Sequence, residues 1–345
     1  MNSFPILHQL FPLEKHEDWI IAHIISSIKS SLSGKIGKIN ENSEELFYNY
    51  IKTSDIDRSS FSYNWPYVVQ ATRNNGFYYH TDLAIIYFYL RKNANVSPYP
   101  YNLVVINHLG QYSEQSVYEL AEAAQKLCIG SVVKNVDLEK IALWRDLNFH
   151  ETEKPWSHYS FRDDNSFPEF VYDIKKYVTL KFNRTTRASI KKFLNEKNYI
   201  FLPYNDSFKN DGLQLLQENA EYLENKGVDF KHEVFLAHRF VFDDSIKNKV
   251  VFAILEENHL IGMSFLTHFQ ENLFFNAIIN QNKPNLMRFL LWKSVAHYCA
   301  TLEEDKKPLY LALQGSENEG QNRWKSFFHP IRSIYRTHVT NMLNH

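Results

Sequence analysis

The side chains best suited to chemistry in this sequence are the cations of one stretch near its middle, residues 175–194. This stretch holds seven Lys and Arg residues and no acidic residue. On a helix, Arg184, Arg187 and Lys191 are spaced i, i+3 and i+7 and therefore share one face. That face either binds a polyanion or is an ordinary solvated surface, and the residue pattern leaves both interpretations open. The opposite side carries three residues expected in a core: Ile190, Phe193 and Leu194.

The chain as a whole does not share this basic character. Its 345 residues carry a formal net charge of -1, so a polyanion would have to be held by a local surface rather than by global attraction. Hydrophobic residues make up 44% and charged residues 22%, which is typical of a folded globular protein. At roughly 150 residues per domain, this length predicts two domains.

Features that indicate targeting or redox chemistry are sparse. The two cysteines, Cys128 and Cys299, form no CxxC or Cys/His cluster and are expected to be buried, unreactive thiols. The start of the chain has no charged region followed by a long apolar run, which argues against a signal peptide. The apolar stretch from Trp19 to Ile28 is far shorter than the roughly 20 residues of a membrane span. We therefore expect a cytoplasmic protein without stable membrane insertion.

Hydrophobic periodicity predicts a similar order of elements in each half. The helix expected to be capped by Ser113 has an apolar stripe that runs from Val117 to Leu127 and Cys128. The first half is expected to contain helices over 19–32, 42–53, 113–128 and 138–147, an aromatic-rich loop or strand over 61–69, a hairpin over 76–90, and strands at 101–107 and 131–136. The second half is expected to contain helices over 213–226, 230–240, 285–302 and 320–328, a hairpin over 250–269 that turns at Glu257 and Asn258, and strands at 273–279 and 309–313.

This repeated order predicts the architecture. A chain of this size satisfies the rules of layer packing when a twisted mixed sheet, flanked by helices, is built twice in an α/β or α+β arrangement. We therefore expect two similar domains, residues 1–170 and 171–345, the second beginning with the basic stretch as a linker helix.

Four stretches, in this order, resemble a known family. They are residues 170–172 leading into LKFNRTTRASIKKF, Phe230 to Phe240 with Glu233, residues 284–299, and GSENEGQNRWKSFFHPI at 315–331. Together they resemble the GNAT-type acyltransferase fold in its doubled form, as in the C-terminal domain of phosphatidylglycerol lysyltransferases (the DUF2156 family) and in Fem-type peptidyltransferases. The likeness covers about residues 60–340 and implies two tandem GNAT-like domains.

The resemblance also implies a reaction, the transfer of an aminoacyl group from an aminoacyl-tRNA to an amine or hydroxyl of a small molecule, a peptide or a lipid headgroup. Because such a donor is already an activated ester, the protein has to position the acceptor and stabilise an oxyanion, and no cofactor is implied. By this likeness Lys325 matches the closing-motif lysine near the donor ester; its alternative is a surface lysine on the last helix. The residues implied to contact the tRNA end are Lys181, Arg184, Arg187, Lys191, Lys192 and Trp324.

An acceptor amine must also lose a proton, and a carboxylate is suited to take it. Glu233 and Glu317 are the candidate bases, although such a family also permits the substrate to manage its own proton transfer. Without that role, Glu233 is an exposed helical carboxylate and Glu317 is a helix N-terminal residue favoured by the helix dipole.

The sequence disfavours several other kinds of site. An acetyl-CoA site needs bare backbone amides at a Gly-rich turn before a helix, whereas residues 280–289, NQNKPNLMRF, contain no glycine. The sequence has no GxGxxG, Walker A, GxSxG or HExxH motif, and we expect no metal. Two other functions stay open: an N-acyltransferase that uses an acyl thioester on CoA or a carrier protein, and a non-catalytic tandem binding protein.

Overall fold

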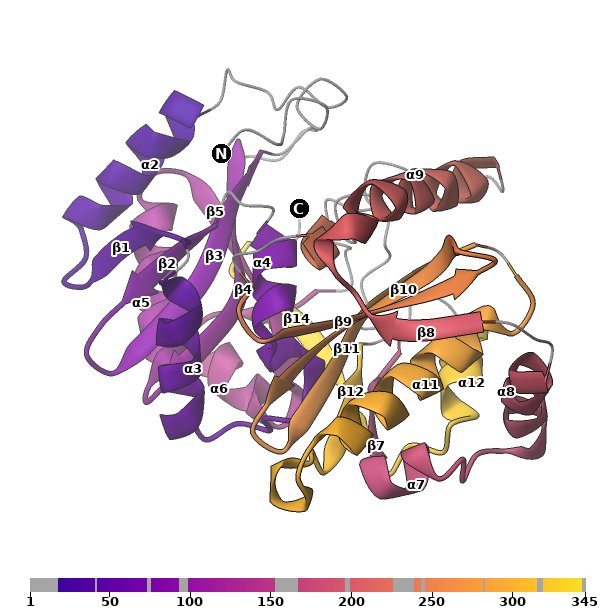
Figure 1. Ribbon diagram of the computed structural model, residues 1–345. Helices are drawn as coiled ribbons and strands as arrows, with labels where there is room; N and C mark the ends of the chain where they lie inside the picture. The colour runs from indigo at the N-terminus through magenta and orange to yellow at the C-terminus, as the bar shows by residue number, and fades with distance from the viewer. Residues whose placement is uncertain are drawn as a thin grey trace.

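In the part of the chain that the structure describes, runs of β-branched and aromatic residues form two seven-stranded mixed sheets, each flanked by helices (Figure 1). The computed structural model describes residues 18–40, 42–72, 76–92, 99–152, 167–195, 199–225, 239–242, 246–281, 283–314 and 319–342. In spatial order, the first sheet contains β1 (Lys35–Lys38), β2 (Phe77–His80), β3 (Ala84–Lys92), β4 (Tyr101–Gly110), β5 (Ile129–Asp137), β14 (Arg336–Thr340) and β6 (His150–Glu151). The second contains β13 (Arg332–Ile334), β7 (Glu169–Asp173), β12 (Tyr310–Leu313), β11 (Asn272–Asn280), β10 (His259–Phe269), β9 (Lys249–Glu256) and β8 (Tyr199–Pro203).

Both sheets follow the same plan. Strands β2, β3 and β4 are antiparallel neighbours, and β5 then lies parallel to β4 after helix α5 (Ser113–Gln125). In the second sheet β9, β10 and β11 repeat the antiparallel run, and β12 lies parallel to β11 after helix α11 (Leu286–Thr301). Parallel neighbours require such a crossover. The twofold repetition expected from the sequence is therefore present.

The two halves exchange a strand. β7, which follows the first half in sequence, pairs with β12 and β13 in the second sheet. β14, the last described strand, crosses back and pairs with β5 and β6 in the first sheet. The expected linker helix is therefore preceded by a strand, and it is divided into α7 (Ile174–Val178) and α8 (Arg184–Asn195). The division into residues 1–170 and 171–345 stays a prediction.

Hydrophobic cores fill the space on both sides of each sheet. Val117 of α5 and Trp144 pack on the face of the first sheet that points away from the second. A second core joins the halves, because Phe47 and Trp65 of the first half share it with Phe265 of β10.

The helices between the sheets are α3 (Ser43–Thr53), α4 (Trp65–Thr72) and α9 (Lys209–Asn225). The outer helices are α2 (Asp18–Ser30), α5 and α6 (Ile141–Asp146) on the first sheet, and α7, α8, α11 and α12 (Glu319–Ser326) on the second. The short 3-10 helices are η1 (Phe61–Tyr63), η2 (Leu138–Lys140), η4 (Asp206–Phe208), η5 (Arg239–Phe242) and η6 (Glu304–Lys306).

Several local expectations are wrong. Residues 61–69 are helical, as η1 and the first part of α4, because Pro66 stands in the first turn of α4, where its missing N–H costs no hydrogen bond. Leu127 and Cys128 are exposed rather than part of the buried stripe, because α5 ends at Gln125 and Cys128 has a left-handed φ of 57°. Ser113 is the first residue of α5 and not its cap, since the N-cap position is held by Tyr112. Cys299 is buried as expected, and burial raises the pKa of its thiol to about 11.

The helix predicted over 230–240 falls almost entirely outside the described residues. Within the described part of the chain, no helix combines the length and apolar character that a membrane crossing requires. The same residues contain no group of three or more His, Cys, Asp or Glu side chains placed to hold a metal ion.

Candidate active site

The parallel ladder between β11 and β12 is short, and its end marks the candidate site. The two strands pair from Asn272 opposite Tyr310 to Phe275 opposite Leu313, while β11 itself continues to Asn280. Asn276 forms a β-bulge, because Phe275 and Ala277 stand opposite consecutive residues of β10 and Asn276 between them is skipped. Bulges are common beside active sites, and ligands of open α/β sheets bind outside the carboxyl ends of parallel strands. We call this place, between Asn276 and Gln314, the divergence point.

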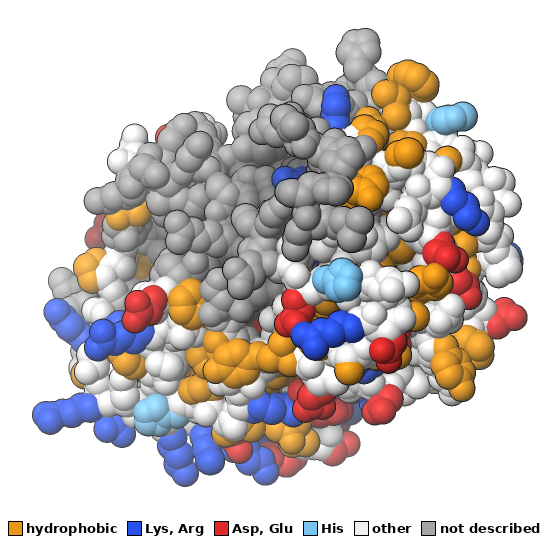
Figure 2. Space-filling view, turned by 180° about the vertical axis from the view of Figure 1, so that it is seen from behind, with side chains coloured by type: hydrophobic (Ala, Val, Ile, Leu, Met, Phe, Trp, Pro, Cys, Tyr) orange, Lys and Arg blue, Asp and Glu red, His pale blue; other side chains and the backbone are white. Residues whose placement is uncertain are grey.

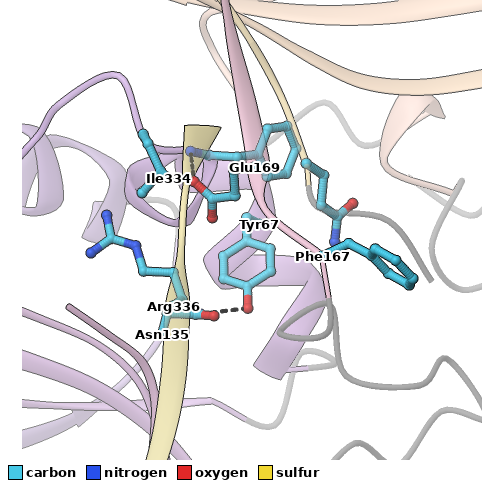
Figure 3. A pocket seen from close by; sticks show the side chains of 8 residues that line it. Tyr67, Asn135, Phe167, Glu169, Ile334 and Arg336 are labelled. Carbon is cyan, nitrogen blue, oxygen red and sulfur yellow. Dashed lines mark hydrogen bonds between the residues drawn. The ribbon is translucent and has the colours of Figure 1, made fainter. Parts of the chain in front are cut away.

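A small hollow lies beside the divergence point and is lined by both halves of the chain (Figure 3). Its empty volume, including the solvent at its mouth, is about 280 Å³. In the first half, Asn135 of β5 donates through Nδ2 to the hydroxyl of Tyr67 at 2.7 Å. Asn135 adopts a left-handed φ of 58°, which Asn tolerates better than most residues. The lining residues are Phe61, Tyr67, Asn135, Phe167, Glu169, Gln314, Ile334 and Arg336.

Lys325, predicted to act on the donor ester, reaches this region. Its Nζ donates to the backbone carbonyl of Gln314 at 2.7 Å, and Gln314 lines the hollow. The hydroxyl of the buried Tyr172 donates to the backbone carbonyl of Lys325 at 3.1 Å, which fixes α12 on β7. Lys325 is therefore a half-buried cation next to the divergence point rather than a fully exposed surface lysine.

Two ionised side chains near the hollow join the halves. The carboxylate of Glu169, on β7, accepts bonds from the hydroxyls of Ser60 and Ser62, both at 2.6 Å, and from the amide of Phe61 at 2.8 Å. The buried guanidinium of Arg336, on β14, forms an ion pair with the half-buried Asp137 at the end of β5. Burial lowers the pKa of Arg336 from its usual value. Sequence reasoning missed both residues, because nothing in the local pattern shows that β7 and β14 cross between the halves.

The other predicted site residues have different surroundings. The ring of Trp324 packs edge-on against Phe328, with 5.2 Å between ring centroids, and is half-buried against the outer core. These are the contacts of a packing residue, and its contact with a substrate stays a prediction. Glu233 and Glu317 lie outside the described residues.

The predicted basic face is present and open to solvent. Arg184, Arg187 and Lys191 are exposed on α8, and Lys and Arg side chains gather along the lower left edge of the view from behind, where α7 and α8 lie (Figure 2). The backbone amide of Asn183 donates to the carbonyl of Phe327 at 3.2 Å, so the beginning of α8 lies against the end of α12. The cations that make up this basic surface, all exposed, are Lys175, Lys176, Lys181, Arg184, Arg187, Lys191 and Lys192.

The core side of α8 differs from the expectation at one position. Ile190 and Phe193 are buried as predicted, but the side chain of Leu194 is 46% exposed. The helix buries only a narrow stripe, from Thr186 through Ile190 to Phe193, and Leu194 lies one residue beyond it at the last turn.

The corresponding region of the first half holds a charged cluster. His108, on β4 beyond its own bulge, hydrogen-bonds through Nδ1 to the hydroxyl of Ser113 at 2.8 Å, and its ring lies edge-on to Trp144. Glu114 pairs with Lys140 at 2.6 Å. Burial lowers the pKa of His108 to about 4, the carboxylate of Glu114 opposing this shift only in part.

This pKa predicts an acid-sensitive contribution to stability. The folded protein holds His108 neutral, whereas the unfolded chain protonates it near pH 6.5, so stability should fall as the pH drops through 6.5 and the loss should be complete just below pH 4. The difference corresponds to about 3 kcal/mol. Urea unfolding at a series of pH values should show that, as the pH falls through this range, the wild type loses about 3 kcal/mol more folding free energy than His108→Gln. The exposed His23→Gln variant should follow the wild type, and superimposable curves for wild type and His108→Gln would contradict the assignment.

Comparison with known proteins shows which solved structures share this fold. No protein-family model matches the sequence, and no curated protein matches it either. A conserved protein of unknown function from Bacteroides thetaiotaomicron aligns with a TM-score of 0.68 at 12% identity, over 89% of this chain and 99% of that one. The DUF2156 C-terminal domain of a putative lysylphosphatidylglycerol synthetase from Agrobacterium fabrum aligns with a TM-score of 0.57 at 11% identity, over 88% of this chain and 93% of that one. FemX aligns with a TM-score of 0.57 at 11% identity, over 90% and 98%.

The chain has a tandem GNAT-like fold. The predicted resemblance to the lysyltransferase C-terminal domain and to Fem-type proteins is thereby confirmed for the fold. At such low identity, the likeness does not carry the activity of those proteins to this chain.

Proposed function

We propose that the protein is an acyltransferase that takes an aminoacyl group from an aminoacyl-tRNA and passes it to an amine or hydroxyl acceptor in the cytoplasm. The observation that carries this proposal is the basic surface beside α12, the helix that brings Lys325 to the divergence point. A row of exposed cations suits a donor whose bulk is a polyanion, since such contacts position a nucleic acid without reading its bases. Similarity of fold to a lysylphosphatidylglycerol synthetase domain and to FemX supports the same choice.

In the proposed reaction the acceptor nitrogen or oxygen attacks the ester carbonyl carbon of the donor. A new amide or ester bond forms, the bond to the ribose oxygen breaks, and the acceptor proton passes to that oxygen. Negative charge develops on the carbonyl oxygen in the transition state, and in this proposal the ammonium of Lys325, which binds the carbonyl of Gln314, stabilises it. The protein's other task is to hold both reactants in contact.

The geometry gives less support to an acyl thioester donor. The loop after β11 leads into α11 through Asn285, which has a left-handed φ of 65° and makes no side-chain cap. Lys283 in this loop forms an ion pair with Glu256. A pyrophosphate group would need bare amides at this helix start, where Pro284 removes one.

The proposal is tested by adding the purified protein to a pool of tRNA charged with radiolabelled amino acids and to a cell extract that supplies acceptors. The measured quantity is the label transferred from tRNA to the acceptors. Transfer that is lost after RNase treatment would support it. Transfer from acyl-CoA that survives RNase would instead support the thioester enzyme. The absence of transfer from either donor, with retained RNA binding, would indicate a binding protein.

The basic surface makes a separate prediction. The triple variant Arg184→Glu, Arg187→Glu and Lys191→Glu should bind tRNA more weakly. The slope of log K against log salt concentration should become shallower by about 2 to 3, because fewer phosphates are neutralised and fewer counterions are released on binding. Fluorescence anisotropy over a salt series measures this slope. A matched triple reversal of the exposed Lys29, Lys35 and Lys38 in the first half changes the net charge equally and should leave the slope unchanged. Equal effects of the two triples would show that only net charge matters.

A further inference from the structure

A closed ring of three side chains joins the two halves at the bulge of β11. Asn64, which follows η1 in the first half, donates through Nδ2 to Oδ1 of Asn276 and accepts from the hydroxyl of Thr267 at 2.8 Å. Asn276 closes the ring by donating through its own Nδ2 to Thr267 Oγ1 at 3.0 Å. Each side chain donates once and accepts once around the ring, so the three bonds polarise one another. Asn64 and Thr267 are completely buried.

The ring holds the residue at which β11 changes course. Asn276 is the extra residue of the bulge and stands opposite no residue of β10 in the backbone ladder, and the ladder with β12 has already ended at Phe275. A bulge locally breaks the ladder and bends its strand. The side chain of Asn276 is fixed within its own sheet by Thr267 and by the carbonyl of Phe274 at 3.3 Å. Asn64 adds a contact from the other half of the chain.

We propose that Asn64 and Thr267 are positioning residues for acyl transfer. By holding the bulge, they set the direction of β11 beyond Phe275 relative to Gln314, whose carbonyl binds Lys325. Through Asn64, the first half thus controls the course of β11 at the site without touching the reacting atoms. This inference rests on the proposed function.

Two substitutions at one position separate the hydroxyl from the volume it fills. Thr267→Val keeps the shape of the side chain and removes the hydroxyl, which breaks the ring, whereas Thr267→Ser keeps the hydroxyl. Ser264→Ala is the matched control, because Ser264 is also completely buried on β10 but bonds Ser294 at 2.6 Å, outside the ring. Asn64→Ala breaks the ring from the first half and should reproduce the Thr267→Val result.

The measurements are backbone amide hydrogen exchange over residues 274–280, and kcat and KM for the aminoacyl donor. Thr267→Val and Asn64→Ala should speed exchange over 274–280 and lower kcat by about 10-fold to 100-fold, with KM within about threefold of wild type, because misplacing reacting groups by about 1 Å has effects of this size. Thr267→Ser should restore both values. Ser264→Ala should lower stability without this kcat loss.

The outcomes separate this inference from the proposed function. Unchanged exchange in Thr267→Val, or a kcat loss no larger than that of Ser264→Ala, would overturn the positioning role while wild-type transfer still supports the function. A wild type that transfers nothing from any donor would remove the proposed function, and the positioning role with it, whatever the exchange shows.

Discussion

Replacing Lys325 with Met should lower the turnover of acyl transfer by about 100-fold while costing only about 1 kcal/mol of folding free energy. The two effects differ because the side chain has two separable roles. Its hydrogen bond to the carbonyl of Gln314 is the polar contact of a half-buried group, and a bond of this kind contributes little to stability. In the proposed reaction its charge acts on the ester oxygen, where one missing donor has a large effect. Single-turnover kinetics and urea unfolding of the same preparation measure both quantities.

Controls for Lys325 are available on the same helix. Arg323→Met removes an exposed cation two residues earlier on α12 and should leave turnover within about twofold of wild type. Lys325→Arg keeps the charge but spreads it over a planar group, so it should recover part of the lost rate. Full activity in Lys325→Met would show that the reaction takes place elsewhere.

Glu169→Ala should destabilise the protein by about 3 to 5 kcal/mol, because hydrogen bonds to a charged group contribute roughly 1.5 to 3 kcal/mol each and are not additive. The substitution leaves the hydroxyls of Ser60 and Ser62 and the amide of Phe61 without their buried acceptor. It also cuts a connection between β7 and the first half. Equilibrium unfolding in urea, monitored by tryptophan fluorescence and circular dichroism, measures the loss.

The control for Glu169 is an exposed carboxylate. Glu122 on α5 accepts a bond from the hydroxyl of Tyr118 at the surface, and Glu122→Ala should change the free energy of unfolding by less than about 0.5 kcal/mol. Equal losses in the two variants would show that the bonds to Glu169 add nothing beyond those of a surface contact. Separate transitions for the two probes in Glu169→Ala would show that the halves have become uncoupled.

The sequence predicted most of the elements whose signal is local. The stripe from Val117 to Ala124 is buried on one face of α5, and the β9–β10 hairpin turns at Glu257 and Asn258, both with positive φ. The expectations failed where the structure depends on distant partners. β7 and β14 are short runs, and no periodicity within five residues indicates which sheet receives them.

The candidate site was predictable only where its residues carry a local signal. Lys325 was predicted from a family resemblance and lies at the divergence point. The cations of α8 were predicted from their helical spacing and are exposed together. Asn64, Asn276 and Glu169 have no such signature, because an isolated Asn or Glu acquires its partner only when the halves meet. Only a contact between distant segments distinguishes these residues from ordinary polar side chains.

The exchange of β7 and β14 has a consequence for synthesis on the ribosome. β5 is made early, yet its neighbour β14 is the last described strand of the chain to be translated. Until then β5 carries an open edge, and unpaired edges invite pairing with other chains. The nascent protein therefore cannot complete its first lobe and then its second, as most multidomain chains do. The strands of the second sheet all end by residue 334, so the first sheet closes last, and a translation product truncated before residue 336 leaves β5 and β6 without the strand that joins them.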